Sequence, residues 1–305
     1  MTMRVSLGLP IDRPDPTGTL TTAAGIAACS QLAERLGFDA VNVTDHPAPD
    51  ERWLRTGHDT LDPFVALSFA AAATSTIKLH TNLLVLGYRN PILTAKAVAS
   101  LDALSGGRTI VGVGVGYMEA EFNALGAAFD DRARRADDAL AAMRKAWSGE
   151  PFDHEGVGYT ARRTIVQPST VQRPHPPIWV GGNSKGAMRR AVEHGAGWSP
   201  MPSPKKLESY LGTPGMETVE ELAERVEELR RMADAAGRTE PLDVIAVPTA
   251  LTIWAHSWEP DLVVEEAKQL QAAGATALVA IVPGADLESY TEAVELFASQ
   301  VLPRI

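Results

Sequence analysis

The sequence has almost no cysteine and no long apolar run. Its one cysteine, Cys29, has no partner for a disulfide within the chain, and no stretch approaches the roughly 20 apolar residues that a membrane-spanning helix needs. The first residues, MTMRVSLGLPIDRPD, also lack the apolar core and small-residue cleavage site of a signal peptide. These absences predict a protein of the reducing cytoplasm without a membrane segment.

Positive charge is also scarce. The chain has 28 Lys and Arg against 38 Asp and Glu, which gives a formal net charge of −10. Because nucleic-acid surfaces need clustered Lys and Arg to neutralise phosphates, this balance argues against DNA or RNA as a partner. An anionic ligand would have to be bound locally, by backbone N–H groups at a helix start or by a few placed cations.

Eight short apolar runs alternate along the chain with stretches of helical spacing, which is typical of parallel βα units. The predicted strands are 5–9, 39–44, 77–86, 109–115, 177–181, 197–201, 243–254 and 276–282. The predicted helices are 26–36, 91–104, 130–147, 184–194, 218–236, 260–273 and 286–300. Pro248 lies inside the seventh strand, where proline cannot donate to a central ladder. Cys29 falls on the apolar face of the first helix, which predicts a position in the core.

This alternation predicts an α/β fold, a (β/α)8 TIM barrel that spans residues 1–305 as a single domain. Residues 149–176 lack a long helical period and are expected to form an insertion with a small hairpin between the fourth and fifth strands. The active site of such a barrel lies at the carboxyl ends of its strands. The residues that follow each strand are therefore the functional candidates.

The second strand ends in VNVTDHPAPDERW, which brings Asp45 and His46 to the mouth. A neutral imidazole can take or give a proton near pH 7, and a neighbouring carboxylate can orient it. An Asp that caps a loop beside an incidental His is the alternative. The loop over 47–64 should wall a substrate pocket, with Trp53, His58 and Asp59 as contact candidates.

The fourth strand carries glycines at 112, 114 and 116. They do not form a dinucleotide fingerprint, because G-x-G-x-x-G would need a further glycine at 117 or 119, where Tyr117 and Glu119 stand. Glycine at every second position removes the side chains from one face of a strand. Either a flat ring or another part of the chain can then approach closely.

The fifth strand ends in PIWVGGNSKGAMRRA, a double glycine before a helix start. Gly181 and Gly182 permit a tight turn, after which the N–H groups of Asn183 and Ser184 would point at a ligand above the helix. A phosphate is favoured there by the unpaired N–H groups and by the helix dipole. An ordinary N-cap formed by Asn183 or Ser184 is the alternative.

Metal and nucleophilic catalysis have weaker support. A metal could be bound by Asp45, His46, His58, Asp59 and Asp62, but no H-x-H strand end, H-E-x-x-H helix or Cys pair accompanies them. No G-x-S-x-G motif marks a serine nucleophile either. A metal-dependent barrel hydrolase is therefore a remote alternative.

Three phrases in this order resemble the bacterial luciferase-like flavin and deazaflavin oxidoreductases. They are VNVTDH, TNLLVLGYRNPILTAKAVASLDALSGGRTIVGVGVGYMEAEFNALG and QRPHPPIWVGGNSKGAMRRAVEHGAGW. The resemblance extends over residues 4–300 and is strongest from 39 to 201. Within the superfamily, the chain most resembles the branch described as coenzyme F420-dependent oxidoreductases.

The resemblance implies a tricyclic flavin-type ring at the barrel mouth, with the cofactor phosphate over the turn at Gly181. His46 would lie beside the ring as the catalytic residue, and a non-proline cis peptide would join Asn82 to Leu83 in a bulge behind it. The expected cofactor-binding residues are Asp45, Asn82, Leu83, Gly114, Gly116, Gly181, Gly182, Asn183 and Ser184.

The chain departs from its relatives at two positions. The sugar-phosphate dehydrogenases of the family carry a catalytic Glu where this chain has Tyr117, which argues against a sugar-phosphate substrate and makes Tyr117 a substrate contact. Val115 offers no hydroxyl where some relatives use one toward the cofactor. The acidic tail of coenzyme F420 would also need a basic rim, for which Lys185, Arg189, Arg52 and Arg55 are the candidates.

The first hypothesis is an oxidoreductase that moves a hydride between coenzyme F420 and an unidentified organic substrate. The second is an FMN-dependent monooxygenase on the same barrel, supplied with reduced flavin by a reductase partner. A flavin-binding protein without turnover is a third. The resemblance also implies a homodimer.

Overall fold

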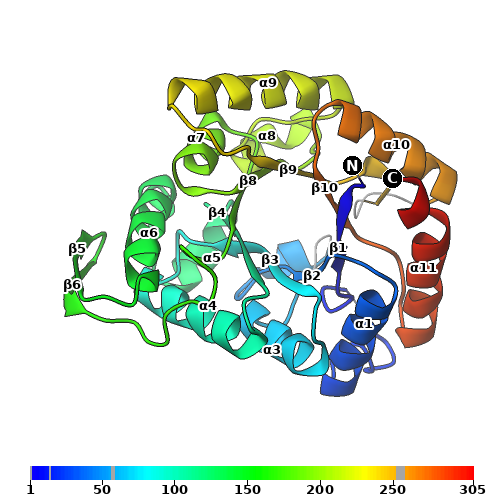
Figure 1. The fold of residues 1–305 in the computed structure, drawn as a ribbon, viewed down its shortest axis with the longest axis horizontal. Coiled ribbons are helices and arrows are strands. Elements are labelled where there is room, and N and C mark those ends of the chain that lie inside the picture. The colour runs from blue at the N-terminus through cyan, green and yellow to red at the C-terminus, as the bar shows by residue number, and fades with distance from the viewer. Residues whose placement is uncertain (1, 14, 56–58, 252–257) are drawn as a thin grey trace.

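The computed structural model describes residues 2–13, 15–55, 59–251 and 258–305. Eight parallel strands close into a barrel in the order β1-β10-β9-β8-β7-β4-β3-β2, with helices around the outside (Figure 1). The barrel strands are β1 (Arg4–Gly8), β2 (Ala40–Val43), β3 (Lys78–Val85), β4 (Thr109–Gly114), β7 (Ile178–Gly181), β8 (Gly197–Ser199), β9 (Asp243–Ala246) and β10 (Ala277–Ala280). The predicted (β/α)8 barrel is therefore confirmed.

The seven predicted helices are also present. They are α1 (Ala23–Arg35), α4 (Pro91–Ser105), α6 (Arg132–Trp147), α7 (Lys185–His194), α9 (Val219–Ala235), α10 (Pro260–Ala272) and α11 (Leu287–Gln300). Cys29 is buried on α1, and this burial raises the pKa of its thiol to about 12, so its predicted core position is confirmed. Within the described residues, every helix is too short or too polar to cross a bilayer.

Several further helices were not predicted. They are α2 (Glu51–Leu54), α3 (Pro63–Ala73), α5 (Glu119–Ala124), α8 (Glu208–Leu211) and the short 3-10 helices Lys205–Leu207, Thr249–Leu251 and Leu302–Arg304. The longest, α3, begins where the Asp62 carboxylate accepts the N–H groups of Phe64 and Val65. Its sequence, PFVALSFAAAA, is apolar on nearly every side. It therefore lacks the one-sided spacing by which a surface helix is recognised.

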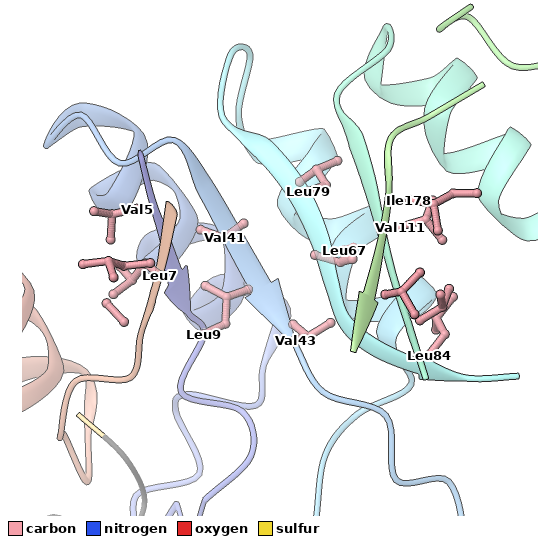
Figure 2. Packing of buried hydrophobic residues seen from close by; sticks show 14 of the residues in the cluster. Val5, Leu7, Leu9, Val41, Val43, Leu67, Leu79, Leu84, Val111 and Ile178 are labelled. Atoms are coloured by element: carbon pink, nitrogen blue, oxygen red, sulfur yellow. The ribbon is translucent and has the colours of Figure 1, made fainter. Parts of the chain in front are cut away.

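Two apolar layers hold the strands in place. The outer layer lies between the strands and the helices and includes Val41, Leu79 and Val111, each fully buried, together with Leu67 from α3 (Figure 2). The inner layer fills the barrel with residues such as Ile245. Because both faces of the strands are packed, their carboxyl ends form a fixed rim for the site.

The seventh strand is shorter than the run 243–254 predicted for it. β9 ends at Ala246, and the chain then forms the 3-10 helix Thr249–Leu251, while 252–254 lie outside the described residues. Pro248 accounts for this difference, because a residue without an N–H group cannot continue a central ladder.

The insertion between β4 and β7 contains the expected hairpin. Strands β5 (Phe152–Gly156) and β6 (Tyr159–Thr164) pair antiparallel in a separate two-stranded sheet. The hairpin projects beyond α6, at the left of Figure 1. It therefore takes no part in closing the barrel.

A chain of hydrogen bonds runs through the barrel interior toward the mouth. His80 Nδ1 lies 3.1 Å from the hydroxyl of Ser6, which also accepts from the side chain of Asn42 at 3.0 Å. The Asn82 amide then donates to the Asn42 side-chain oxygen at 3.3 Å. Burial lowers the pKa of His80 to about 3, so the ring stays neutral near pH 7.

The buried His80 should make folding stability depend on pH. In the unfolded chain this histidine binds a proton below about pH 6.5, whereas in the folded protein it does so only near pH 3. Between these two pH values the free energy of unfolding therefore decreases as the pH falls, by up to about 1.4 kcal/mol per pH unit. Between pH 6.5 and pH 5, wild type should lose roughly 1.5 kcal/mol more than a His80→Gln variant. Urea unfolding at the two pH values measures this difference, and identical losses in the two proteins would contradict it.

Candidate functional site at the barrel mouth

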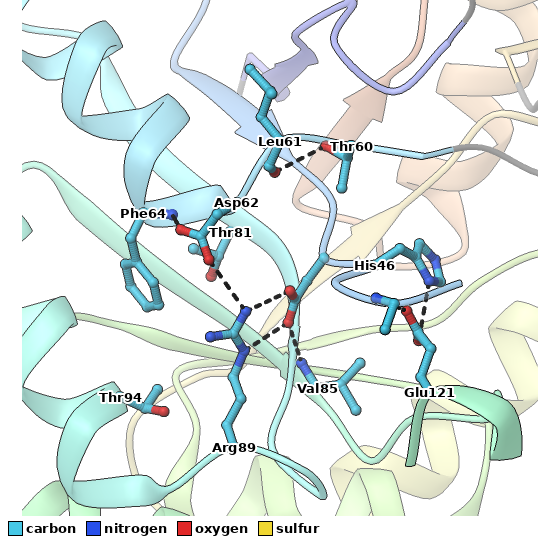
Figure 3. Close-up of polar contacts among 12 residues, drawn as sticks. His46, Thr60, Leu61, Asp62, Phe64, Thr81, Val85, Arg89, Thr94 and Glu121 are labelled. Carbon is cyan, nitrogen blue, oxygen red and sulfur yellow. Dashed lines mark hydrogen bonds and ion pairs between the residues drawn. The ribbon is translucent and has the colours of Figure 1, made fainter. Parts of the chain in front are cut away.

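Asp45 lies directly after the carboxyl end of β2 and is 3% exposed. Its carboxylate accepts two hydrogen bonds from Arg89, at 2.6 and 2.9 Å, and a third from the N–H of Val85 at 3.1 Å (Figure 3). Arg89 also lies 3.8 Å from Asp62. Asp45 was predicted among the cofactor-binding residues, and in the structure its carboxylate joins the end of β2 to the end of β3 and to Arg89.

His46 is also buried at the mouth, and its partner is Glu121. The ring Nδ1 lies 3.3 Å from Glu121 Oε2, and Glu121 Oε1 accepts the N–H of Ala48 at 3.3 Å (Figure 3). Glu121 is 2% exposed and comes from α5, the helix that follows β4. It was not among the predicted site residues, although it stands four residues after the predicted contact Tyr117.

Two aromatic side chains lie beside His46. The ring centroid of Trp53 is 5.1 Å from that of His46, and the centroid of Tyr117 is 6.2 Å from His46 and 5.8 Å from Trp53. Burial, with a smaller contribution from the Glu121 charge, raises the pKa of Tyr117, so its hydroxyl remains protonated at neutral pH. Two of the three predicted substrate contacts, Trp53 and Tyr117, thus lie next to the predicted catalytic residue. The third, His58, lies outside the described residues.

Strand β3 changes register at the mouth. The peptide bond between Asn82 and Leu83 is cis, as the resemblance implies, and the pairing with β4 shifts between Thr81 and Leu84. The side chain of Leu83 lies close to two glycines of the neighbouring strands. A Cβ atom at Gly114 would come within 2.6 Å of it, and one at Gly181 within 2.1 Å.

The glycines of β4 therefore make room for this chain's own side chains. Leu83 packs over Gly114, while a Cβ atom at Gly116 would come within 2.5 Å of Val85 and 2.8 Å of Phe122. Gly114 and Gly116 were expected to face the cofactor. The alternative considered above, in which another part of the chain approaches these glycines closely, matches the structure, because a neighbouring side chain fills the space beside each.

The turn after β7 needs glycine, and it also anchors a loop. Gly182 has a φ of 112°, which favours a residue without a Cβ atom. Asn183 is 1% exposed, its N–H donates to Thr213 Oγ1 at 3.2 Å, and its amide donates to the carbonyls of Met201 and Pro214. Asn183 was expected to direct its N–H at a ligand. Instead it holds the loop between β8 and α9 against the turn.

The start of α7 retains donors for an anion. The Ser184 hydroxyl caps the helix by accepting the N–H of Ala187 at 3.2 Å, so the N-cap considered as the alternative is present. Among the described residues, the backbone N–H groups of Lys185 and Gly186 donate no hydrogen bond. These N–H groups and the helix dipole suit a phosphate.

The metal alternative gains no support from the described part of the chain. His58 lies outside the described residues. Asp45 and Asp62 both lie within ion-pair distance of Arg89, and the Asp59 side chain accepts the N–H of Thr60. No group of three His, Cys, Asp or Glu side chains suitable for a metal occurs in the described ranges.

A separate cavity of about 620 Å³ lies between α9 and α10. Its lining includes Pro200, Leu222 and Leu262 together with the acidic Glu217 and Glu265. None of the predicted site residues lines it, and its carboxylates disfavour an anionic ligand. The mouth around His46 therefore remains the candidate site.

The chain is similar to known proteins over most of its length. The family described as luciferase-like monooxygenase matches residues 3–269. The FMNH2-dependent dimethylsulfone monooxygenase of Pseudomonas putida is 30% identical over 222 residues, which cover 71% of this chain and 55% of that protein. Among solved structures, monooxygenase RslO1 from Streptomyces bottropensis has a TM-score of 0.79 at 22% identity, over 99% of both chains. The coenzyme F420-dependent tetrahydromethanopterin reductase from Methanopyrus kandleri has a TM-score of 0.74 at 20% identity, again over 99% of both.

Proposed function

The chain belongs to the luciferase-like monooxygenase family, and from this premise we propose that it transfers a hydride between the deazaflavin coenzyme F420 and an organic substrate. The observation that carries the proposal is the pairing of buried His46 with Glu121 at the mouth that the start of α7 also borders. A coenzyme F420-dependent reductase has the same fold, so a barrel of this architecture can accommodate the coenzyme.

The dimensions of the mouth suit a ring with a phosphate-bearing side chain. β7 and β2 are separated by β4 and β3 in the barrel. Three strand spacings amount to roughly 14 Å along the arc. The N–H groups of Lys185 and Gly186 would hold the phosphate, and the residues around the Asn82–Leu83 peptide and His46 would border the ring. When bound, the coenzyme supplies the site that accepts or donates the hydride.

The protein's own residues would orient the substrate and exchange its proton. Trp53 and Tyr117 form an aromatic wall beside His46, which would hold the substrate carbon against the ring and exclude water. His46 would accept or release the proton that accompanies the hydride, because imidazole works as both acid and base near pH 7.

The acidic tail of the coenzyme would gain little from the expected basic rim. Three of the four candidate cations are already paired, Lys185 with Glu228 at 2.8 Å, Arg189 with Asp137 at 2.9 Å and Arg55 with Glu51 at 2.5 Å. We therefore propose that the protein binds the coenzyme mainly through its phosphate and its ring. The acidic tail would stay in solvent, where ion pairs contribute little to affinity.

A second candidate function is an FMN-dependent monooxygenase fed by a reductase. The relative from Pseudomonas putida, with its FMNH2-dependent activity, favours this alternative. The two reactions differ in their use of oxygen, because only the monooxygenase consumes it.

Turnover without oxygen separates the two functions. Purified protein would be incubated anaerobically with coenzyme F420 and a panel of alcohols, and with the reduced coenzyme and matching carbonyl compounds, while the absorbance of the coenzyme is followed. The deazaflavin proposal expects bleaching or recovery of the coenzyme without oxygen. Oxygen consumption with reduced FMN, and no anaerobic turnover of coenzyme F420, would favour the monooxygenase.

We also propose a homodimer formed through α3. This helix has no charged residue, yet its Val65 and Phe69 are 55% and 47% exposed. Leu93 and Leu104 of the neighbouring α4 are exposed as well. A helix that is apolar on all sides is normally covered, and two copies of an uncharged face can meet about a twofold axis without charge repulsion.

A charge at this face should separate the subunits. We expect wild type to sediment as a dimer and Phe69→Glu as a monomer at micromolar concentration, because the new carboxylate would have to be buried without a partner. Leu262→Glu, at an exposed leucine of α10, is the matched control and should remain dimeric. A monomeric wild type, or a dimeric Phe69→Glu variant, would rule out this interface.

A further inference from the structure

Glu121 is a buried carboxylate that binds one short loop with both of its oxygens. Oε2 contacts the ring of His46 and Oε1 accepts the N–H of Ala48, each at 3.3 Å. The two contacts cross 75 and 73 residues of sequence, from α5 to the loop after β2. Glu121 thus fixes both the imidazole and the backbone that carries it.

The position of Glu121 in the fold makes this contact rigid. Its helix, α5, is held by Phe122, whose side chain is fully buried against Tyr88 and Phe129 at ring distances of 5.1 and 5.3 Å. A carboxylate with 2% exposure is costly to bury unless it is hydrogen-bonded or paired. The described contacts that meet this cost are the loop N–H and the imidazole.

The chemistry of the pair sets the tautomer of His46. An ionised carboxylate only accepts hydrogen bonds, so the nitrogen that faces it, Nδ1, must carry a proton. In the neutral ring, the lone pair is then on Nε2.

We propose that Glu121 is the positioning residue of His46, which holds Nε2 ready to exchange the substrate proton. This inference rests on the function proposed above. For an alcohol substrate, Nε2 would take the hydroxyl proton, and the oxidised coenzyme, when bound, would supply the acceptor for the hydride and its two electrons. The carbon would become a carbonyl, the ring of His46 an imidazolium and the coenzyme its reduced form, while Glu121 would remain a carboxylate. The reverse reaction returns both hydrogens.

A single isosteric substitution separates this role from a purely structural one. In Glu121→Gln, the amide oxygen can still accept the N–H of Ala48, whereas the amide NH2 group would donate to His46 Nδ1 and force the proton onto Nε2. A structural role needs only the shape and the loop contact, so it predicts normal turnover. The positioning role predicts a loss in kcat of roughly 100-fold or more, as when a catalytic histidine is held in the wrong tautomer, with coenzyme affinity unchanged.

The tautomer itself is measured without coenzyme or substrate. Nitrogen-15 NMR of histidine-labelled protein at alkaline pH distinguishes Nδ1–H from Nε2–H, and comparison with a His46→Asn spectrum assigns the signal among the seven histidines. We expect Nδ1–H in wild type and Nε2–H in Glu121→Gln. Glu119→Gln, at an exposed glutamate of the same helix, is the control and should match wild type.

The outcomes distinguish this inference from the function on which it rests. An Nε2–H signal in wild type, or wild-type turnover in Glu121→Gln, would overturn the positioning role. The wild-type spectrum gives its answer even if the variant does not fold. Absence of any coenzyme F420 turnover in wild type, together with the Nδ1–H tautomer, would instead refute the proposed function and leave the Glu121–His46 geometry supported.

Discussion

Replacing His46 with Asn should lower turnover with coenzyme F420 by roughly 100- to 10,000-fold, the usual contribution of a general acid or base. Asn keeps a polar side chain of similar reach beside Glu121, but it cannot exchange a proton near neutral pH. The loss should appear in kcat, with little change in coenzyme affinity, because we place the phosphate at α7 rather than at His46.

Steady-state kinetics with the preferred substrate measures this effect, and fluorescence titration of the coenzyme measures affinity in the same preparation. His154→Asn is the control, since His154 pairs with Asp138 at the surface hairpin, outside the barrel sheet. Turnover close to that of wild type in His46→Asn would show that the proton takes another route.

Changing Ser184 to Asp should weaken coenzyme binding through charge alone. Asp is as good an N-cap as Ser, so the start of α7 should be preserved while a carboxylate is placed beside the proposed phosphate position. Two like charges about 4 Å apart repel by roughly 1 to 4 kcal/mol near a protein surface, which corresponds to roughly a 5-fold to several hundred-fold loss in affinity.

The control for this experiment is Ser184→Ala, which removes the cap without adding charge. It should cost about 1 kcal/mol in the free energy of unfolding and change coenzyme affinity much less than Ser184→Asp does. Asn183 is unsuitable for the same purpose, because its side chain anchors the loop at Met201 and Pro214. Equal affinities in wild type and Ser184→Asp would place the phosphate elsewhere.

The barrel was predictable because its strands are buried on both faces and stand out as short apolar runs between amphipathic helices. The exceptions have local causes. β9 stops before Pro248, and α3 is apolar on almost every side, so neither follows the simple periodic pattern. Pro248 ends the first, and the Asp62 side chain that caps the second marks its start.

The candidate site was predictable only in part. Asp45 and His46 were found because they follow a strand end, and the aromatic contacts of His46 with Trp53 and Tyr117 agree with that placement. Glu121 was missed because its contact with His46 joins positions 75 residues apart, and nothing local marks such a pair.

The roles of the polar and glycine residues depend on partners that the sequence does not identify. Asn183 was expected to meet a ligand, but the loop that returns at Thr213 takes its N–H. Gly114 was expected to face a ring, but Leu83, from the strand with the cis peptide, fills the space beside it. Both assignments required the folded arrangement of neighbouring strands and loops.

The central claim is that the mouth binds the deazaflavin coenzyme, and equilibrium titration tests it most directly. Purified coenzyme-free protein would be titrated with coenzyme F420 and, separately, with FMN, with binding followed by fluorescence. We predict tight binding of coenzyme F420 and weak binding of FMN, with the former reduced in Ser184→Asp. Tight FMN binding with weak coenzyme F420 binding, or binding of neither, would contradict the account.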